Sequence, residues 1–244
     1  MASKLIRHLD LPCYMFDCRE CLRPSSFMDI AQELAAAGSA DGGFSDQDIA
    51  EHGLVWILAR MKVVFNKIPH RCDSVTAETW HRGLSGPYFI RDYRLLDADG
   101  GVAVASTSTW IIMDTASRRA MRGDRITDII PSSPQCGEEA VGELAGKIIF
   151  PKDAPETVVA QHEVVYSDLD YNGHANNAKY TLWALDALPS ELTTSRSPRE
   201  ITINFNNEAH LGDVISLLLH SSGDTYIIEG RSNGLQVFIE EIKI

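Results

Sequence analysis

The fold is decided by residues 178–189, whose sequence is AKYTLWALDALP. Apolar side chains fall on nearly every face of a helix drawn through this stretch, and Pro189 closes the helix because proline cannot continue the backbone hydrogen bonding. A helix that is apolar nearly all round is buried inside a protein. We therefore expect a helix that begins at Asn176 or Asn177 and is enclosed by another layer of structure.

Runs typical of β-strands surround this helix. One run precedes it and four follow, at 158–165, 201–206, 213–220, 225–231 and 235–243. The first part of the chain has the same order. Apolar residues at helical spacing predict a helix over 26–37, with Ser25 or Ser26 as its N-cap and Gly38 as its end. A strand-like segment precedes this helix and four strand-like runs follow it, at 11–20, 54–65, 74–82, 88–96 and 102–113.

One order of elements, repeated after about 150 residues, predicts a duplicated domain. Each copy consists of a long buried helix against a curved antiparallel β-sheet, which is the hot-dog fold. We therefore predict an α+β protein with a double, or tandem, hot-dog fold. The predicted parts are an N-terminal domain over 1–130, a linker over 131–157 and a C-terminal domain over 158–244.

The composition narrows the classes of partner and compartment. The chain has 244 residues and a net charge of −12, which repels nucleic acid and anionic membranes. No stretch reaches the ~18 uncharged apolar residues of a membrane-spanning helix. Five cysteines at irregular spacing are typical of free thiols in a reducing compartment. We expect a cytoplasmic protein with no nucleic-acid or membrane partner.

Residues 167–177, SDLDYNGHANN, carry two carboxylates, three carboxamides and one imidazole just before the second helix. Such residues are also common in ordinary turns and helix caps, so composition alone leaves both interpretations open. A helix that starts at Asn176 or Asn177 directs free backbone N–H groups toward this loop. Those groups can stabilise a developing oxyanion.

The segment resembles a known family signature. Asp170-x-Asn172-x-His174-Ala175-Asn176-Asn177, continued by Tyr180 and Trp183, is similar to the Asp-x-Asn-x-His-Val-Asn-Asn-x-x-Tyr-x-x-Trp signature of acyl-acyl-carrier-protein (acyl-ACP) thioesterases, with only Ala175 departing from it. Residues 54–61 and 73–80 resemble strands of the family's first domain. The resemblance covers nearly the whole chain. It implies hydrolysis of fatty acyl-ACP to free fatty acid and holo-carrier protein, which terminates fatty-acid synthesis.

The family completes its site with a Glu-Tyr-Arg-Arg-Glu-Cys-like run, which corresponds here to residues 204–209, NFNNEA. This places Glu208 on the carboxylate and Ala209 on the cysteine, so a thiol nucleophile is absent at that position. The resemblance implies that Glu208 is the general base for a water, with His174 sharing that role. It further implies that Asn172 holds the water or the thioester carbonyl and that Asp170 orients the loop or His174. Backbone N–H groups near Asn176 and Asn177 would bind the oxyanion, and no cofactor or metal is needed.

Superposing the two copies at an offset of 151 residues aligns His174 with Arg23 and Asn172 with Cys21. The first copy then lacks the His and Asn, which predicts one active site per chain and leaves the first half to form an acyl-chain pocket. The candidate pocket residues are Phe27, Ile30, Leu34, Trp56 and Met61, although the pattern of each favours ordinary core.

The expected partner is an acyl carrier protein that bears a phosphopantetheine-linked fatty acyl chain. Carrier proteins are acidic, as this chain is, so docking needs a local basic patch. The densest one consists of Arg118, Arg119, Arg122 and Arg125. The sequence leaves open the acyl chain length, an acyl-coenzyme A donor, a hot-dog hydratase or dehydratase, and a non-catalytic acyl-binding module. It also leaves open whether the chain is a monomer or a homodimer.

Overall fold

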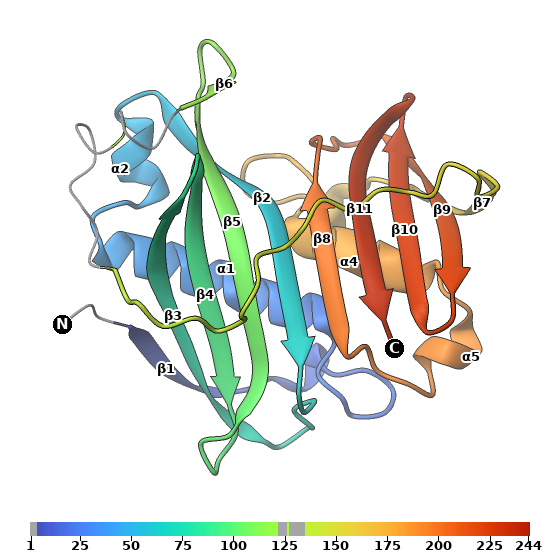
Figure 1. Ribbon diagram of the computed structural model, residues 1–244, viewed down its shortest axis with the longest axis horizontal. Helices are drawn as coiled ribbons and strands as arrows, with labels where there is room; N and C mark the ends of the chain where they lie inside the picture. The colour runs from blue at the N-terminus through green and yellow to red at the C-terminus, as the bar shows by residue number, and fades with distance from the viewer. Residues whose placement is uncertain (1–3, 122–125, 127–134) are drawn as a thin grey trace.

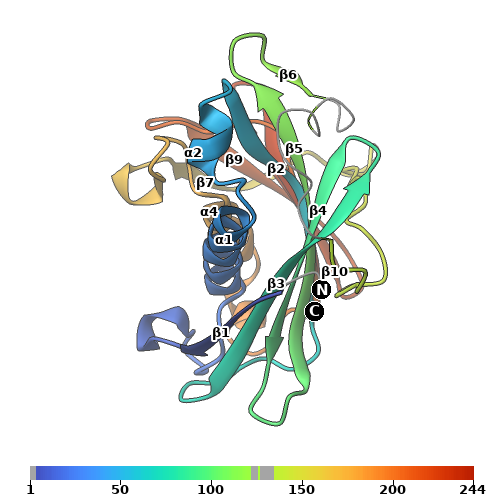
Figure 2. The ribbon, with the colours of Figure 1, turned by 90° about the vertical axis from the view of Figure 1, so that its left-hand side faces the viewer.

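The computed structural model describes residues 4–121, 126 and 135–244. They form one continuous antiparallel sheet that curves around two helices lying end to end on its concave face (Figures 1 and 2). The strand order is β1-β3-β4-β5-β2-β8-β11-β10-β9-β7, with β6 added beside β5. No helix of the described residues is long and apolar enough to cross a membrane.

The first half holds the sheet from β1 to β2 and the long helix α1. Its elements are β1 (Leu5–Asp10), a 3-10 turn (Cys13–Met15), α1 (Pro24–Asp41), α2 (Asp46–Ala50), β2 (Leu54–Phe65), β3 (Ser74–Ser85), β4 (Tyr88–Leu96), β5 (Val102–Asp114) and β6 (Arg119–Ala120). The second half repeats this plan around α4. Its elements are β7 (Val158–Glu163), a 3-10 turn (Tyr166–Asp168), α4 (Asn177–Asp186), α5 (Ser190–Thr193), β8 (Glu200–Phe205), β9 (Val214–Ser222), β10 (Thr225–Ser232) and β11 (Leu235–Lys243).

The two halves meet where β2 pairs with β8. Arg60 lies opposite Asn204, and the pairing continues to Val64 opposite Glu200. Outward from this seam the two half-sheets have matching strand orders, β2-β5-β4-β3-β1 and β8-β11-β10-β9-β7. One hydrophobic core runs through both halves and includes the buried residues of both α1 and α4. The helix-on-curved-sheet arrangement predicted for each half is therefore present.

Residues 135–157 cross the opposite, convex face of the sheet (Figure 1). Trp80 Nε1 donates to the Glu138 carbonyl at 2.9 Å, and buried Asp92 accepts the Ala140 N–H at 2.9 Å. Further along, the Asn204 side chain accepts from Ile148 N–H and donates to the Gly146 carbonyl, each at 2.9 Å. This segment is thus tied to strands of both halves.

The first helix differs from its prediction at both ends. Arg23 is the N-cap and Pro24 is the first helical residue, where the N–H that proline lacks is not needed. The helix also continues past Gly38 to Asp41. Gly38 lies inside the helix, where a Cβ would be 2.6 Å from Arg91 Nη1, so the glycine leaves room for that guanidinium. The predicted strand over 11–20 is also wrong, since the edge strand is β1 and the segment after it contains a 3-10 turn.

The duplication holds, at an offset of 153 residues instead of 151. The two edge strands begin at residues 5 and 158, the two 3-10 turns at 13 and 166, and the helix N-caps are Arg23 and Asn176. The correct register places His174 on Cys21 and Asp170 on Asp17. The first copy still lacks the His and the Asn.

Glu240 on β11 is buried in the second half, under α4. One carboxylate oxygen accepts a hydrogen bond from Thr181 Oγ1 at 3.1 Å, and the other has no hydrogen-bond partner. Burial raises the pKa of Glu240 to about 8, because a carboxylate loses its hydration there. Glu240 therefore keeps its proton in the folded protein at pH values where the unfolded chain has released it.

Glu240→Gln should flatten the dependence of stability on pH. In the wild type, the folded state holds a proton that the unfolded state loses above its pKa near 4.5, so the free energy of unfolding falls as pH rises from about 4.5 to 8. The slope contributed by this group is up to about 1.4 kcal/mol per pH unit. Urea unfolding at pH 5, 6.5 and 8 measures it, with Glu241→Gln as control because Glu241 faces the other side of the strand. Parallel pH profiles for wild type and Glu240→Gln would contradict the assignment.

Candidate active site

Asp170 organises the loop between β7 and α4. Its Oδ1 accepts the backbone N–H of Asn172 at 2.8 Å and that of His174 at 3.2 Å. Its own backbone N–H donates to the His174 carbonyl at 2.8 Å. Gly173 completes the turn with a φ of 80°, in the left-handed region that favours glycine. These bonds fix the positions from which the Asn172 and His174 side chains project.

The loop leads directly into the N-terminus of α4. Asn176 is the N-cap, and its Oδ1 accepts the Ala178 N–H at 2.9 Å. The Asn176 backbone N–H donates to the Asp168 carbonyl at 2.8 Å. Asn177 is the first helical residue, whose N–H has no acceptor within the helix. Of the backbone donors that the sequence singled out, the Asn177 N–H is therefore the one available to an oxyanion.

Glu208 lies in the loop after β8, opposite His174. Glu208 Oε2 is 3.8 Å from His174 Nε2 and 3.6 Å from Arg118 Nη2. The first distance is longer than a hydrogen bond, so both groups are free to bond to a water or a substrate. Both side chains are half-buried, at 34% exposure. The Ala175 N–H donates to the Ala209 carbonyl at 2.8 Å, so backbone pairing between the two loops holds these side chains together.

His210 is a residue that the sequence reasoning missed. Its backbone forms an isolated β-bridge with His174. The centroids of the two imidazole rings are 4.9 Å apart, and the ring planes make an angle of 69°. One ligand atom each from His174, Glu208 and His210 lies within 4.8 Å of the others, a set that could hold a metal ion. The nearby Arg118 guanidinium opposes a cation there. A metal-free reaction stays a prediction.

A cavity of about 610 Å³ lies beside the loop, a volume in the range of small-molecule sites. Most of its walls come from α1, α2 and strands of the first half, and the second half contributes Asp170, Tyr171, Asn172 and Asn177. Tyr171 also links the loop to α2, because its hydroxyl donates to Asp46 Oδ2 at 2.6 Å. His174 and Glu208 are not part of the cavity lining.

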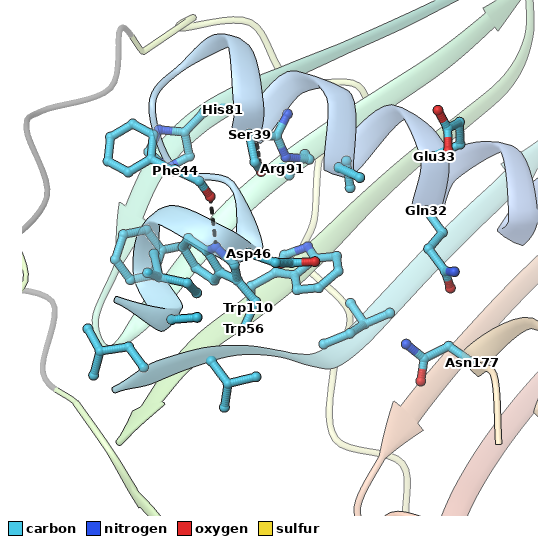
Figure 3. A pocket seen from close by; sticks show the side chains of 18 of the residues that line it. Gln32, Glu33, Ser39, Phe44, Asp46, Trp56, His81, Arg91, Trp110 and Asn177 are labelled. Carbon is cyan, nitrogen blue, oxygen red and sulfur yellow. Dashed lines mark hydrogen bonds between the residues drawn. The ribbon is translucent and has the colours of Figure 1, made fainter. Parts of the chain in front are cut away.

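Aromatic side chains gather on one side of the cavity, where Figure 3 shows Phe44, Trp56 and Trp110 close together. The Trp56 ring packs edge to face against the rings of Phe89 and Trp110, with ring centroids 5.0 Å and 6.5 Å apart. Its Nε1 donates a hydrogen bond to the Phe44 carbonyl at 3.2 Å. Trp56 is therefore the one predicted pocket residue that lines this cavity. The residues that α1 turns toward the cavity include polar Asp29, Gln32 and Glu33.

The other predicted pocket residues have different surroundings. Phe27, Ile30 and Leu34 belong to the main hydrophobic core, on the apolar face of α1, and do not line the cavity. Met61 is also in the core and borders only a second, small cavity of about 20 Å³. The amphipathic pattern located the helix, but it did not show which face of the helix borders a cavity.

The first half retains the frame of this loop without its chemistry. Asp17 Oδ1 accepts the backbone N–H groups of Arg19 at 2.8 Å and Cys21 at 3.0 Å, as Asp170 does 153 residues later. Arg19 therefore replaces Asn172, and Cys21 replaces His174. The bridge from Cys21 to His70 matches the one from His174 to His210. All five cysteines are free.

The structure describes two of the four arginines in the predicted basic patch. Arg118 lies between β5 and β6 with a 70% exposed side chain, and Arg119 is an exposed residue of β6. Arg118 is also the guanidinium next to Glu208, so the patch adjoins the candidate site. Arg122 and Arg125 lie outside the described residues.

The fold and the loop define a protein with two fused hot-dog modules and one Asp-Asn-His site. Residues 3–131 match the model of the acyl-ACP thioesterase N-terminal domain, and residues 152–238 match that of the acyl-ACP thioesterase C-terminal domain. The chain belongs to the acyl-ACP thioesterase family.

Curated relatives of the chain are acyl-carrier-protein thioesterases. The chain is 28% identical to oleoyl-acyl carrier protein thioesterase 2 of Arabidopsis thaliana over 82% of its own length and 58% of the relative's. It is 27% identical to a palmitoyl-acyl carrier protein thioesterase of Gossypium hirsutum over 79% of its own length and 49% of the relative's. The chain thus spans about half the length of these curated relatives.

Among solved structures, a 12:0-ACP thioesterase from Umbellularia californica superposes with a TM-score of 0.88 at 21% identity, covering 98% of this chain and 96% of that one. An acyl-ACP thioesterase from Bacteroides thetaiotaomicron superposes with a TM-score of 0.84 at 20% identity, covering 98% of this chain and 97% of that one. These similarities confirm the predicted double hot-dog fold.

Proposed function

We propose that this chain hydrolyses the thioester of a fatty acyl group carried on the phosphopantetheine of an acyl carrier protein. The products are free fatty acid and holo-carrier protein, so the reaction terminates fatty-acid synthesis. The observation that carries the proposal is the facing pair of Glu208 and His174 beside a loop that borders a 610 Å³ cavity. Family membership supports the same class of substrate.

In the proposed mechanism, Glu208 removes a proton from a water molecule whose oxygen attacks the thioester carbonyl carbon. His174 shares the proton, and the Asn172 side chain holds the water or the carbonyl. The resulting oxyanion is stabilised by the Asn177 N–H at the start of α4, where the helix dipole is positive. The carbon–sulfur bond then breaks and the departing thiolate takes up the proton. Ala209 has no group that could attack the thioester instead.

Incubation with matched series of acyl-ACP and acyl-coenzyme A thioesters, with free acid measured, tests the function directly. Release of free acid from acyl-ACP supports the proposal. Preferential release from acyl-coenzyme A would identify the other donor. Hydration or dehydration of the acyl chain without free acid would indicate a hydratase or dehydratase, and ligand binding without turnover an acyl-binding module.

Glu208→Gln should lower kcat by about 10²–10⁴-fold, the usual contribution of a general base, because the amide keeps the shape but cannot accept the proton. His174→Ala should be comparably severe. Steady-state kinetics with acyl-ACP measures both, with folding checked by circular dichroism. If Glu208→Gln keeps more than about half of the wild-type kcat, Glu208 is not the base.

Asp170→Ala and its counterpart Asp17→Ala form a matched pair, since each removes a carboxylate that accepts two backbone N–H groups. Both variants should lose about 1–3 kcal/mol of unfolding free energy. Only Asp170→Ala should also lower kcat, because Asp17 supports a loop without the Asn and His. Urea unfolding and kinetics on both variants check this; equal losses of kcat would show that the Asp170 effect is general destabilisation.

Arg119→Glu combined with Arg122→Glu should raise KM for acyl-ACP several-fold and flatten its salt dependence, because charge steering acts over a Debye length of ~10 Å at 0.1 M salt. Turnover of a short acyl-coenzyme A should change little. Arg118 is left intact because it adjoins Glu208. Arg199→Glu, on an exposed site near Asp224, is the control. Equal effects on both donors, or none, would contradict the docking role.

A further inference from the structure

Part of the cavity wall is polar. His81 on β3 and Arg91 on β4 are directly opposite in the strand register, so their side chains project from the same face of the sheet. Both line the cavity, together with Ser39 from the last turns of α1. Figure 3 shows these three side chains at one end and Gln32 and Asn177 at the other. The polar group therefore lies at the end of the cavity away from Asn177.

Among the residues that the structure describes, the Arg91 guanidinium has no ion-pair partner. Its guanidinium contacts two neutral hydroxyl oxygens, that of Thr79 at 3.4 Å and that of Ser39 at 3.3 Å. No carboxylate among the described residues lies within 4.0 Å of it. Burial lowers the pKa of Arg91, although an arginine stays protonated at neutral pH. A partly buried guanidinium with long contacts to neutral oxygens retains strong capacity to donate hydrogen bonds.

His81 beside it is also unsatisfied. Neither of its buried ring nitrogens has a hydrogen-bond partner in the part of the chain that the structure describes, and the ring stacks on Phe89 with the ring centroids 6.1 Å apart. Burial and the Arg91 charge lower the pKa of His81 to about 4, so the ring is neutral at pH 7 and offers one N–H donor and one acceptor. Buried polar atoms normally have partners, so an unpartnered His81 beside an Arg91 that contacts only neutral oxygens, both lining a cavity, indicates a ligand with polar atoms at that point.

We propose that the cavity takes acyl chains whose far end carries an oxygen, either a hydroxyl or a carboxylate, and that His81 and Arg91 bind this oxygen. The inference rests on the proposed function and specifies its substrate class. The methylene portion of the chain lies along Trp56, Trp110 and Phe89. The terminal oxygen accepts hydrogen bonds from the Arg91 guanidinium and the His81 N–H. A methyl-terminated chain of the same length leaves the His81 nitrogens unpaired and the Arg91 guanidinium with neutral partners only.

Three acyl-ACP substrates of equal chain length, ending in a methyl, a hydroxyl or a carboxylate, test the proposal when free acid is measured over a series of lengths. At the best length, the hydroxyl or the carboxylate form should have a kcat/KM at least about tenfold above the methyl form. A preference for the carboxylate over the hydroxyl assigns the main contact to the Arg91 charge. Equal or better turnover of the methyl form at every length would overturn the proposal.

Variants test which residues cause the preference for an oxygen-ended chain. His81→Phe keeps the stacking on Phe89 and removes both nitrogens, and should reduce the tenfold preference to near unity. Arg91→Met should do so most strongly for a carboxylate, whereas Arg91→Lys should retain part of it. Gln32→Leu, at the other end of the cavity, is the matched control and should leave the ratio unchanged. A preference that survives both His81→Phe and Arg91→Met would refute the assignment.

Binding of free acids separates this inference from the proposed hydrolysis. A terminal hydroxy acid or dicarboxylic acid should raise the Tm of the wild type more than the matched fatty acid, and His81→Phe should abolish the difference. If this preference is found but no thioester is cleaved, the hydrolytic function fails and the recognition stands. If methyl-ended thioesters are cleaved with neither a kinetic nor a binding preference, only the recognition fails.

Discussion

Backbone pairing between β2 and β8 is the constraint on which the rest of the structure depends. It turns two half-sheets into one and places α1 and α4 end to end in a shared core. The seam is reinforced by Lys62, which is largely buried and lies 3.3 Å from Glu200 on the facing strand while also pairing with Glu143 of the connecting segment. Because the cavity walls come from the first half and its border loop from the second, the candidate site exists only when the halves are joined.

Duplication followed by divergence explains why the two halves share a backbone turn and differ in the side chains that it presents. Both retain an aspartate that accepts two backbone N–H groups and so builds the same turn before its helix. The residues that project from this turn differ: Asn172 and His174 in one copy, Arg19 and Cys21 in the other. Burial raises the pKa of Cys21, and the nearby Asp17 charge adds to the effect, so the thiol stays protonated. The backbone frame is therefore common to both halves, and the candidate chemistry belongs to one.

The sequence predicted elements with strong local patterns and missed those set by tertiary contacts. Strands 54–65, 88–96 and 235–243 match β2, β4 and β11 to the residue because alternation and turn residues mark their ends. The edge strand β1 was missed because four of its six residues are exposed and its sequence shows no clean alternation. His210 was missed because only the pairing of two distant loops sets it against His174, and the role of Arg118 was missed because only the fold brings it to Glu208. The cavity lining required knowing which face of α1 meets the sheet.

Charge around the site bears on the direction of the proposed reaction. Asp29, Glu33, Asp46 and Asp170 all line the cavity, and Glu208 lies beside the same loop. A thioester carries no charge at its reacting carbon, so these acids do not oppose its binding there. Hydrolysis creates a carboxylate at that carbon, and like charges in a partly desolvated site repel strongly. Arg118 is the cation that offsets this field near Glu208, and its 70% exposure keeps its attraction weak. In the proposed reaction, the arrangement beside the loop accepts a neutral thioester group and favours departure of the carboxylate that forms at that carbon.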